Sequence, residues 1–255
     1  GGFPRLATAM RELAAGASNV LRLHAGDAIT GDLYFTLFGG EADADLMNQV
    51  CFDAFAVGNH EFDAGDAGLK RFLDYLSKRT WDCRTPALGA NVAPEVGASP
   101  LARFSARDYL LPHVVLERGG RRIGIVGIDV AQKTMRSSNP DAGTRFLDEA
   151  AIAQAQVDLL TAQGVDIIVL LTHVGYRSDL DLARTLTGVD LIVGGDSHTL
   201  LGEDFRALGL APEGPYPTRV RNPEGEMVCV AHAWQYTWLV GVLDASFDGS
   251  GRVTD

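Results

Sequence analysis

The sequence is poor in cysteine, in positive charge and in long apolar runs. Its three cysteines, Cys51, Cys83 and Cys229, include no closely spaced pair, which predicts isolated apolar side chains rather than a zinc ribbon or a disulfide framework. The longest apolar stretch, residues 165–171, is far too short to cross a bilayer. The net charge of −11 argues against a nucleic-acid backbone or an anionic membrane as the main partner, although bound cations would still allow the chain to handle anions.

The beginning of the sequence has neither a Met nor the apolar core segment of a signal peptide, so we expect a processed or truncated chain. The 255 residues are 46% hydrophobic and 22% charged, an ordinary globular composition that allows one large domain or two small ones with a sizeable core.

Short apolar runs typical of buried strands alternate with amphipathic patterns typical of helices. Helices are predicted near residues 4–15, 42–50, 65–76, 148–162 and 179–186, and strands near residues 20–24, 54–57, 87–92, 114–118, 122–128, 166–171, 191–193, 227–231 and 238–247. Gly119-Gly120 predicts a hairpin turn, and the Gly- and Pro-rich residues 202–226 predict a long excursion. The pattern favours α/β layers with mixed sheets.

An amide, an imidazole and two carboxylates crowd together directly after the apolar run at residues 54–57. Asn59 offers a neutral oxygen, His60 a proton carrier or ligand, and Asp63 an acceptor for the other imidazole N–H. A loop after a buried strand faces the crevice in which open α/β sheets bind ligands. The alternative is an ordinary strand-to-helix turn, with Asp63 or Asp66 capping the next helix.

Four predicted strands end in a group that could bind a metal: Asp27, Asn59, His173, and Asp196 with His198. If these strands share one sheet and run the same way, their ends meet at one rim. Carboxylate, amide oxygen and imidazole together suit divalent ions such as Mn²⁺ or Zn²⁺, and a carboxylate that bridges two ions supports phosphoryl transfer.

Each of these positions also has a structural explanation. Asp27 fits turn chemistry beside Gly26, His173 fits a hydrogen-bonded buried histidine, and Asp196 fits a helix cap or a turn. The metal interpretation rests on their joint occurrence. For His24 and His113 a packing role is expected, and for His232, which lies among Trp234, Tyr236 and Trp238, both a pocket wall and a core or interface cluster are open.

These motifs resemble, in order, those of the calcineurin-like metallophosphoesterases, and more narrowly the 5′-nucleotidase branch with its UDP-sugar hydrolases and NAD nucleotidases. The matching stretches are residues 24–27, 58–63, 172–173 and 195–198. Residues 35–43 and the Gly-Asp-Ser-His form are most similar to NAD nucleotidases. The resemblance implies an α/β/β/α sandwich with two divalent ions, Mn²⁺ or Zn²⁺ foremost and Mg²⁺ as a further option.

Carried over onto this sequence, the resemblance implies that Asp27 bridges the two ions. Asn59, His173 and Asp196 would complete one metal site, and His198 would lie at the other. His60, oriented by Asp63, would stabilise the transition state or protonate the leaving oxygen.

Two departures from the family pattern stand out. Many members carry His at the position of Asp196, and an aspartate there adds negative charge and favours harder ions such as Mn²⁺. The family's first strand supplies an Asp-x-His ligand pair that no residues before Phe3 provide. The expected organisation is therefore a metallophosphoesterase domain over residues 1–255 that lacks its first strand, with a C-terminal nucleotide-binding domain absent.

The expected function is hydrolysis of nucleotide phosphate esters or anhydrides by in-line attack of a metal-bound hydroxide. The substrate would be a nucleotide or dinucleotide, the partner the C-terminal domain of the parent chain, and the location periplasmic or extracellular, all by family resemblance. Two alternatives are a relative that hydrolyses thiosulfonate with similar motifs and a metal-binding module without turnover.

Overall fold

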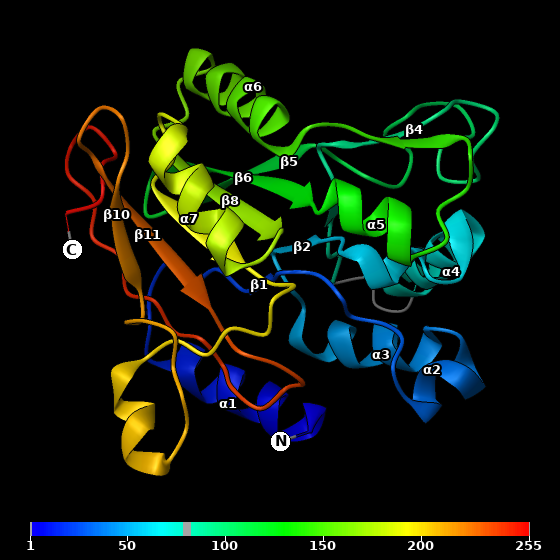
Figure 1. The fold of residues 1–255 in the computed structure, drawn as a ribbon, viewed down its shortest axis with the longest axis horizontal. Coiled ribbons are helices and arrows are strands. Elements are labelled where there is room, and N and C mark those ends of the chain that lie inside the picture. The colour runs from blue at the N-terminus through cyan, green and yellow to red at the C-terminus, as the bar shows by residue number, and fades with distance from the viewer. Residues whose placement is uncertain (1, 79–82, 255) are drawn as a thin grey trace.

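Helices and strands alternate along most of the chain in this computed structural model, which describes residues 2–78 and 83–254 (Figure 1). The helices are α1 (Phe3–Ala15), α2 (Leu33–Phe38), α3 (Glu41–Val50), α4 (Gly65–Lys78), α5 (Ala131–Ser137), α6 (Glu149–Ala162) and α7 (Tyr176–Thr185), with short 3₁₀ helices η1 (Asn59–Phe62) and η2 (Glu203–Leu208). The strands are β1 (Leu23–His24), β2 (Ala54–Ala56), β3 (Ala87–Leu88), β4 (Val92–Pro94), β5 (His113–Arg118), β6 (Arg121–Asp129), β7 (Thr144–Phe146), β8 (Ile167–His173), β9 (Leu191–Gly194), β10 (Thr218–Arg221) and β11 (Met227–His232).

The larger sheet has the order β10-β11-β9-β8-β6-β5, in which the four central strands are parallel and both edge strands are antiparallel to their neighbours. A smaller parallel sheet has the order β1-β2-β3, and β4 pairs with β7 antiparallel. The predicted mixed sheets are thus confirmed.

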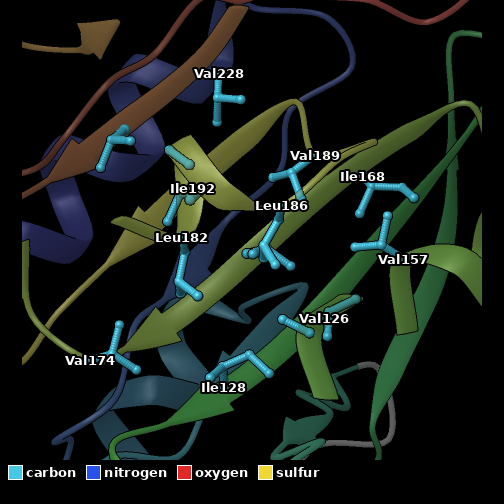
Figure 2. Close-up of a cluster of buried hydrophobic side chains, with 14 of the residues drawn as sticks. Val126, Ile128, Val157, Ile168, Val174, Leu182, Leu186, Val189, Ile192 and Val228 are labelled. Carbon is cyan, nitrogen blue, oxygen red and sulfur yellow. The ribbon is translucent and has the colours of Figure 1, made fainter. Parts of the chain in front are cut away.

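Side chains of the larger sheet alternate between two buried layers, as the period of a strand requires. Val126, Ile168 and Ile192 face α6 and α7 and pack in the cluster that Figure 2 shows. Their neighbours Ile125 and Val169 face the smaller sheet, where they meet small residues such as Ala54 and Ala56. The other face of the smaller sheet packs against α3 and α4. Two sheets between two helix layers form the expected α/β/β/α sandwich.

Local sequence signals account for several element boundaries. The Asp148 carboxylate accepts a hydrogen bond from the Ala151 N–H and caps α6, as predicted. Gly119 and Gly120 both have positive φ, at 57° and 73°, and join β5 to β6 in the predicted hairpin.

Three predictions were wrong. Residues 238–247 do not form a strand: the described part of the chain offers them no neighbouring strand beyond an isolated Phe247–Val253 bridge. The excursion at residues 202–226 contains η2 and β10, and β10 pairs with β11. Cys51 and Cys83 are not isolated but form a disulfide with Cα atoms 5.6 Å apart, because α3 and the chain after α4 meet beside β2. Within the described residues, no helix combines the length and the apolar character that a bilayer crossing needs.

A candidate metal centre

The loops that follow β1, β2, β8 and β9 meet at one rim of the sandwich. Parallel pairing places the ends of β8 and β9 side by side, with Thr172 opposite Gly194. The loop after β1 reaches them because the Ala25 carbonyl oxygen lies 2.6 Å from Nδ1 of His173. Glycine is required for this approach: a Cβ on Gly58 would lie 2.5 Å from an Asp27 oxygen, and one on Gly26 would lie 2.5 Å from the His173 ring.

Asp27 and His173 lie in direct contact at this rim, and Asp196 lies next to them. An Asp27 oxygen is 2.9 Å from His173 Nε2, and an Asp196 oxygen is 3.8 Å from the same nitrogen. Asp27 and Asp196 both have positive φ, at 55° and 77°, a strained backbone that clusters at functional sites. Burial by itself lowers the pKa of His173, and the Asp27 carboxylate outweighs burial and raises that pKa to about 9.

Several buried polar atoms at or beside this rim have no hydrogen-bond partner among the described residues. They include the Asn59 side-chain oxygen, Asp129 Oδ1 and His173 Nε2, whose 2.9 Å approach to Asp27 does not have hydrogen-bond geometry. A buried amide oxygen without a donor is costly. His173 Nδ1 is already engaged with Ala25, so Nε2 is the ring nitrogen that faces Asp27 and Asp196. An amide oxygen and an imidazole nitrogen beside two carboxylates form a donor set that fits a divalent cation.

His60 and Asp63 form the dyad that the sequence predicted. His60 Nδ1 lies 2.6 Å from an Asp63 oxygen, so the carboxylate fixes the tautomer and leaves Nε2 free. The His60 ring is exposed, while its backbone N–H donates to Asp27 over 3.0 Å. The dyad is therefore tied to the candidate metal ligand through the backbone.

Glu61 is a buried organiser of the site that sequence reasoning did not assign a role. Its carboxylate accepts the backbone N–H groups of Gly58 at 2.6 Å, Ala28 at 2.7 Å, Asp27 at 2.9 Å and Ile29 at 3.4 Å. Burial, followed by repulsion from Asp27, raises the pKa of Glu61 to about 8. It lies within the quoted motif, but only the fold brings residues 27–29 to it.

Two further groups border the site without having been predicted. The Lys133 ammonium, on α5, contacts the Asp196 carboxylate. Asp129 ends β6 opposite His173 and accepts the Thr134 hydroxyl at 2.7 Å, and burial raises its pKa to about 7. No local sequence pattern predicts that Lys133 and Asp129 lie at this site, because the pairing of β6 with β8 brings them there.

His198 is the predicted ligand that the structure does not bring to the others. Its ring is exposed and packs edge-on against Tyr236, with centroids 5.0 Å apart. In residues 2–78 and 83–254, no group of three or more His, Cys, Asp or Glu side chains is arranged to hold a metal ion. The candidate centre is therefore not a formed metal site: Asp27 and Asp196 oxygens lie 2.9 and 3.8 Å from His173 Nε2, and His60, the neighbour of Asn59, contacts Asp27.

The remaining histidines have structural surroundings. His24 packs edge-on against Phe52 and Phe55, and burial lowers its pKa to about 4. His113 bonds to Gln156. His232 is buried with its Nε2 2.7 Å from an Asp179 oxygen, and it also lines the cavity that contains Asp27 and His173, so both of its predicted surroundings apply.

Residues 1–200 match the family described as calcineurin-like phosphoesterase. The chain is 43% identical to the probable 5′-nucleotidase of Treponema pallidum over 256 residues and 40% identical to the NAD 5′-nucleotidase of Haemophilus influenzae over 252 residues. These alignments cover 100% and 98% of this chain but 41% and 40% of the relatives, so the chain spans about two-fifths of their length.

Solved structures agree with this relationship. The NAD nucleotidase of Haemophilus influenzae superposes with a TM-score of 0.92 at 40% identity, covering 100% of this chain and 48% of that one. The 5′-nucleotidase precursor of Thermus thermophilus gives 0.90 at 41% identity, covering 100% and 47%. The family uses divalent metal ions, in keeping with the unpartnered donor atoms described above. On the family match and these relatives, the chain belongs to the calcineurin-like phosphoesterases.

Proposed function

We propose that this chain is the metal-binding, catalytic part of a nucleotidase that hydrolyses phosphate esters or anhydrides of nucleotides. The observation that carries the proposal is the meeting of Asp27 and Asp196 at His173 Nε2, over 2.9 and 3.8 Å, with the residues on either side of Asn59 against Asp27. The relatives at 40% identity or more are named as 5′-nucleotidases, which supports a nucleotide substrate over the thiosulfonate alternative.

Asp27, Asn59, His173 and Asp196 would hold one divalent ion, and Asp27 would share a second ion with His198. The mixed oxygen and nitrogen donors suit Mn²⁺ or Zn²⁺, and the carboxylate at Asp196 favours Mn²⁺. Such ions supply an activated water and neutralise phosphoryl oxygens when they are bound.

The chain's own residues would position and protonate the substrate. In its protonated form His60, oriented by Asp63 through the 2.6 Å contact, would give its Nε2 proton to the leaving oxygen and keep the Nδ1 proton that Asp63 accepts. Its exposed ring faces solvent and therefore incoming substrate. Lys133 adds a positive charge at Asp196 that can approach a phosphate oxygen.

A large groove supports the proposal that a further strand of the parent chain belongs beside β1. The cavity has a volume of about 1810 Å³ and is walled by α1 and by apolar residues of both sheets, among them Leu21, Leu23 and Val193. Leu243, Ala245 and Phe247 also line this cavity and are less exposed than the residues between them, which is the alternation of a strand that has no hydrogen-bonded neighbouring strand among the described residues. A strand seated there would pair with β1 and bring its following loop to the metal rim.

The parent protein would also carry a C-terminal nucleotide-binding domain and act outside the cytoplasm. The first point is supported by relatives more than twice as long as this chain, since the alignment covers 41% of the first. The second is supported by the Cys51–Cys83 disulfide, because such bonds persist in oxidising compartments.

One observation favours the second candidate, a metal-binding module without turnover. His198 does not join the other candidate ligands, and the Lys133 ammonium contacts Asp196 where a cation would bind. A module of this kind would hold one ion and leave phosphate esters intact.

The test compares the 255-residue chain with a form extended by its natural upstream residues. Metal content and hydrolysis of AMP and NAD are measured side by side, with and without a chelator. We expect the extended form to hold two ions and to hydrolyse a nucleotide only when metal is present. One bound ion and no hydrolysis in both forms would establish the inert module instead.

A further inference from the structure

The Glu61 side chain joins the loop that follows β1 to the loop that follows β2. Its Oε2 accepts both the Gly58 N–H at 2.6 Å and the Asp27 N–H at 2.9 Å, so a single atom links the two loops. Its Oε1 accepts the N–H groups of Ala28 at 2.7 Å and Ile29 at 3.4 Å. Glu61 is 0% exposed, and these four partners are all backbone groups. The side chain therefore fixes where the backbone of each loop runs.

Local helix capping accounts for only one of these four hydrogen bonds. Glu61 is the third residue of η1, and its bond back to the Gly58 N–H is the return half of a capping box. The three bonds to residues 27–29 instead cross 32 to 34 positions of the sequence to another loop. A helix cap needs none of these three, so the start of η1 does not explain them.

The N–H groups of residues 27–29 form a backbone nest that the Glu61 carboxylate fills. Consecutive N–H groups that converge in this way make a concave site for an anion. Residues 25–32 belong to no helix or strand, so no regular ladder holds these groups. Asp27 also has a φ of 55°, a conformation that a residue with a side chain keeps only where its surroundings enforce it. The bonds to Glu61 provide that enforcement.

The backbone of Asp27 in turn determines where its carboxylate lies. One oxygen accepts the His60 N–H at 3.0 Å, and the other lies 2.9 Å from Nε2 of His173. His60 directly precedes Glu61 in η1, so one short helix holds Asp27 twice, by its backbone and by its side chain. A return of Asp27 to negative φ would swing its carboxylate away from His173.

We propose that Glu61 is a positioning residue that acts through Asp27: by filling the nest of residues 27–29, it holds the Asp27 carboxylate against His173. The role of Asp27 as a metal ligand rests on the proposed function, whereas the nest and the side chain that fills it do not. Without Glu61 three N–H groups lose their acceptor, and the loop after β1 is no longer tied to Gly58.

The first measurement is amide hydrogen exchange of the metal-free chain, which reports these hydrogen bonds directly. In the unsubstituted chain the amides of residues 27–29 should exchange slowly, although they lie outside helices and strands. Glu61→Gln keeps the shape of the side chain but turns an NH₂ group toward N–H donors. It should raise the exchange rates of residues 27–29 by about 10-fold or more.

The second measurement is Mn²⁺ binding followed by electron paramagnetic resonance. Glu61→Gln should weaken it by about 10- to 100-fold, as expected when the partner that orients a ligand is removed. The matched control is Asp190→Asn, which alters another buried carboxylate that accepts a backbone N–H, that of Ile168 at 2.8 Å. Asp190 precedes β9 and thus lies at the end of the sheet away from the rim. Its change should lower the free energy of unfolding in urea without affecting Mn²⁺ binding or the exchange of residues 27–29.

Equal exchange of residues 27–29 in Glu61→Gln and the unsubstituted chain would overturn the proposal, as would equal Mn²⁺ affinities of the two. Equal weakening of Mn²⁺ binding by Asp190→Asn would also overturn it, because metal affinity would then follow stability alone. Should Glu61→Gln fail to fold, slow exchange of residues 27–29 in the unsubstituted chain upholds the nest and rapid exchange refutes it. If the unsubstituted chain binds no Mn²⁺, the proposed function fails, and faster exchange in Glu61→Gln still upholds the nest.

Discussion

Replacement of Asp179 by alanine should destabilise the chain severely, because Asp179 joins two buried donors below the rim. One carboxylate oxygen lies 2.7 Å from Nε2 of His232, and the other accepts the Thr172 hydroxyl at 2.7 Å. Both Asp179 and His232 are almost completely buried. Burial raises the pKa of Asp179, although the hydrogen bond from His232 opposes the shift.

The expected cost follows from leaving these donors without an acceptor. Removing one partner of a buried pair costs about 3–5 kcal/mol, a large part of the roughly 5–15 kcal/mol that stabilises a typical folded protein. For a chain of this size such a loss lowers the melting temperature by about 6–20 °C. Asp179→Asn keeps the shape and one acceptor, so its cost should be about 1–3 kcal/mol.

Urea unfolding followed by circular dichroism measures these differences. The matched control is Asp181→Ala on the same helix, because Asp181 is 77% exposed and its partner Arg184 is exposed as well. That change should cost at most about 0.5 kcal/mol. A loss below about 1 kcal/mol for Asp179→Ala would refute the reasoning, since it would mean that water or another group satisfies His232 and Thr172.

Three further predictions concern the disulfide, a buried histidine and the His60–Asp63 dyad. Cys51→Ser should lower the free energy of unfolding by about 3–4 kcal/mol, because the disulfide closes a loop with a sequence separation of 32. Reduction of the unsubstituted chain with dithiothreitol should have a similar effect. An unchanged free energy of unfolding in either case would contradict the crosslink. The pKa of His24 is about 4 in the folded chain, against an ordinary value of 6.5, because burial disfavours the charged ring. The unfolded chain therefore takes up a proton first as pH falls, and the free energy of unfolding should drop by about 3 kcal/mol between pH 6.5 and pH 4. Urea unfolding at those two pH values should show a smaller drop for His24→Phe than for the unsubstituted chain. His60→Asn should lower turnover by about 10²–10⁴ with metal content unchanged, and loss of metal would show that His60 is a ligand.

Much of the fold followed from local sequence patterns because the strands and helices are strongly apolar. The continuous apolar run of β8 and the cap at Asp148 depend on neighbours within a few residues, and both appear as predicted. The strand at 238–247 and the Cys51–Cys83 bond depend instead on what lies beside each segment in space. Local residue patterns therefore could not predict the outcome for either segment.

The candidate site divides in the same way. Asp27, His173 and Asp196 could be predicted because each follows a strand, and parallel strands bring their ends together. Glu61 could not be given its role, since the groups it binds at residues 27–29 are more than thirty positions away. His198 has a backbone φ of 51° and its ring packs against Tyr236, and no spacing rule anticipates either feature.

The most direct test of the metal centre compares Mn²⁺ binding by the unsubstituted 255-residue chain with Mn²⁺ binding by its Asn59→Leu variant. The buried Asn59 oxygen has no hydrogen-bond partner within residues 2–78 and 83–254, so leucine should leave the metal-free chain at least as stable while weakening Mn²⁺ binding by about 10-fold or more. Electron paramagnetic resonance measures the bound ion, and urea unfolding measures the stability. Unchanged Mn²⁺ affinity in Asn59→Leu would contradict the assignment of Asn59 as a ligand and, with it, the centre proposed at this rim.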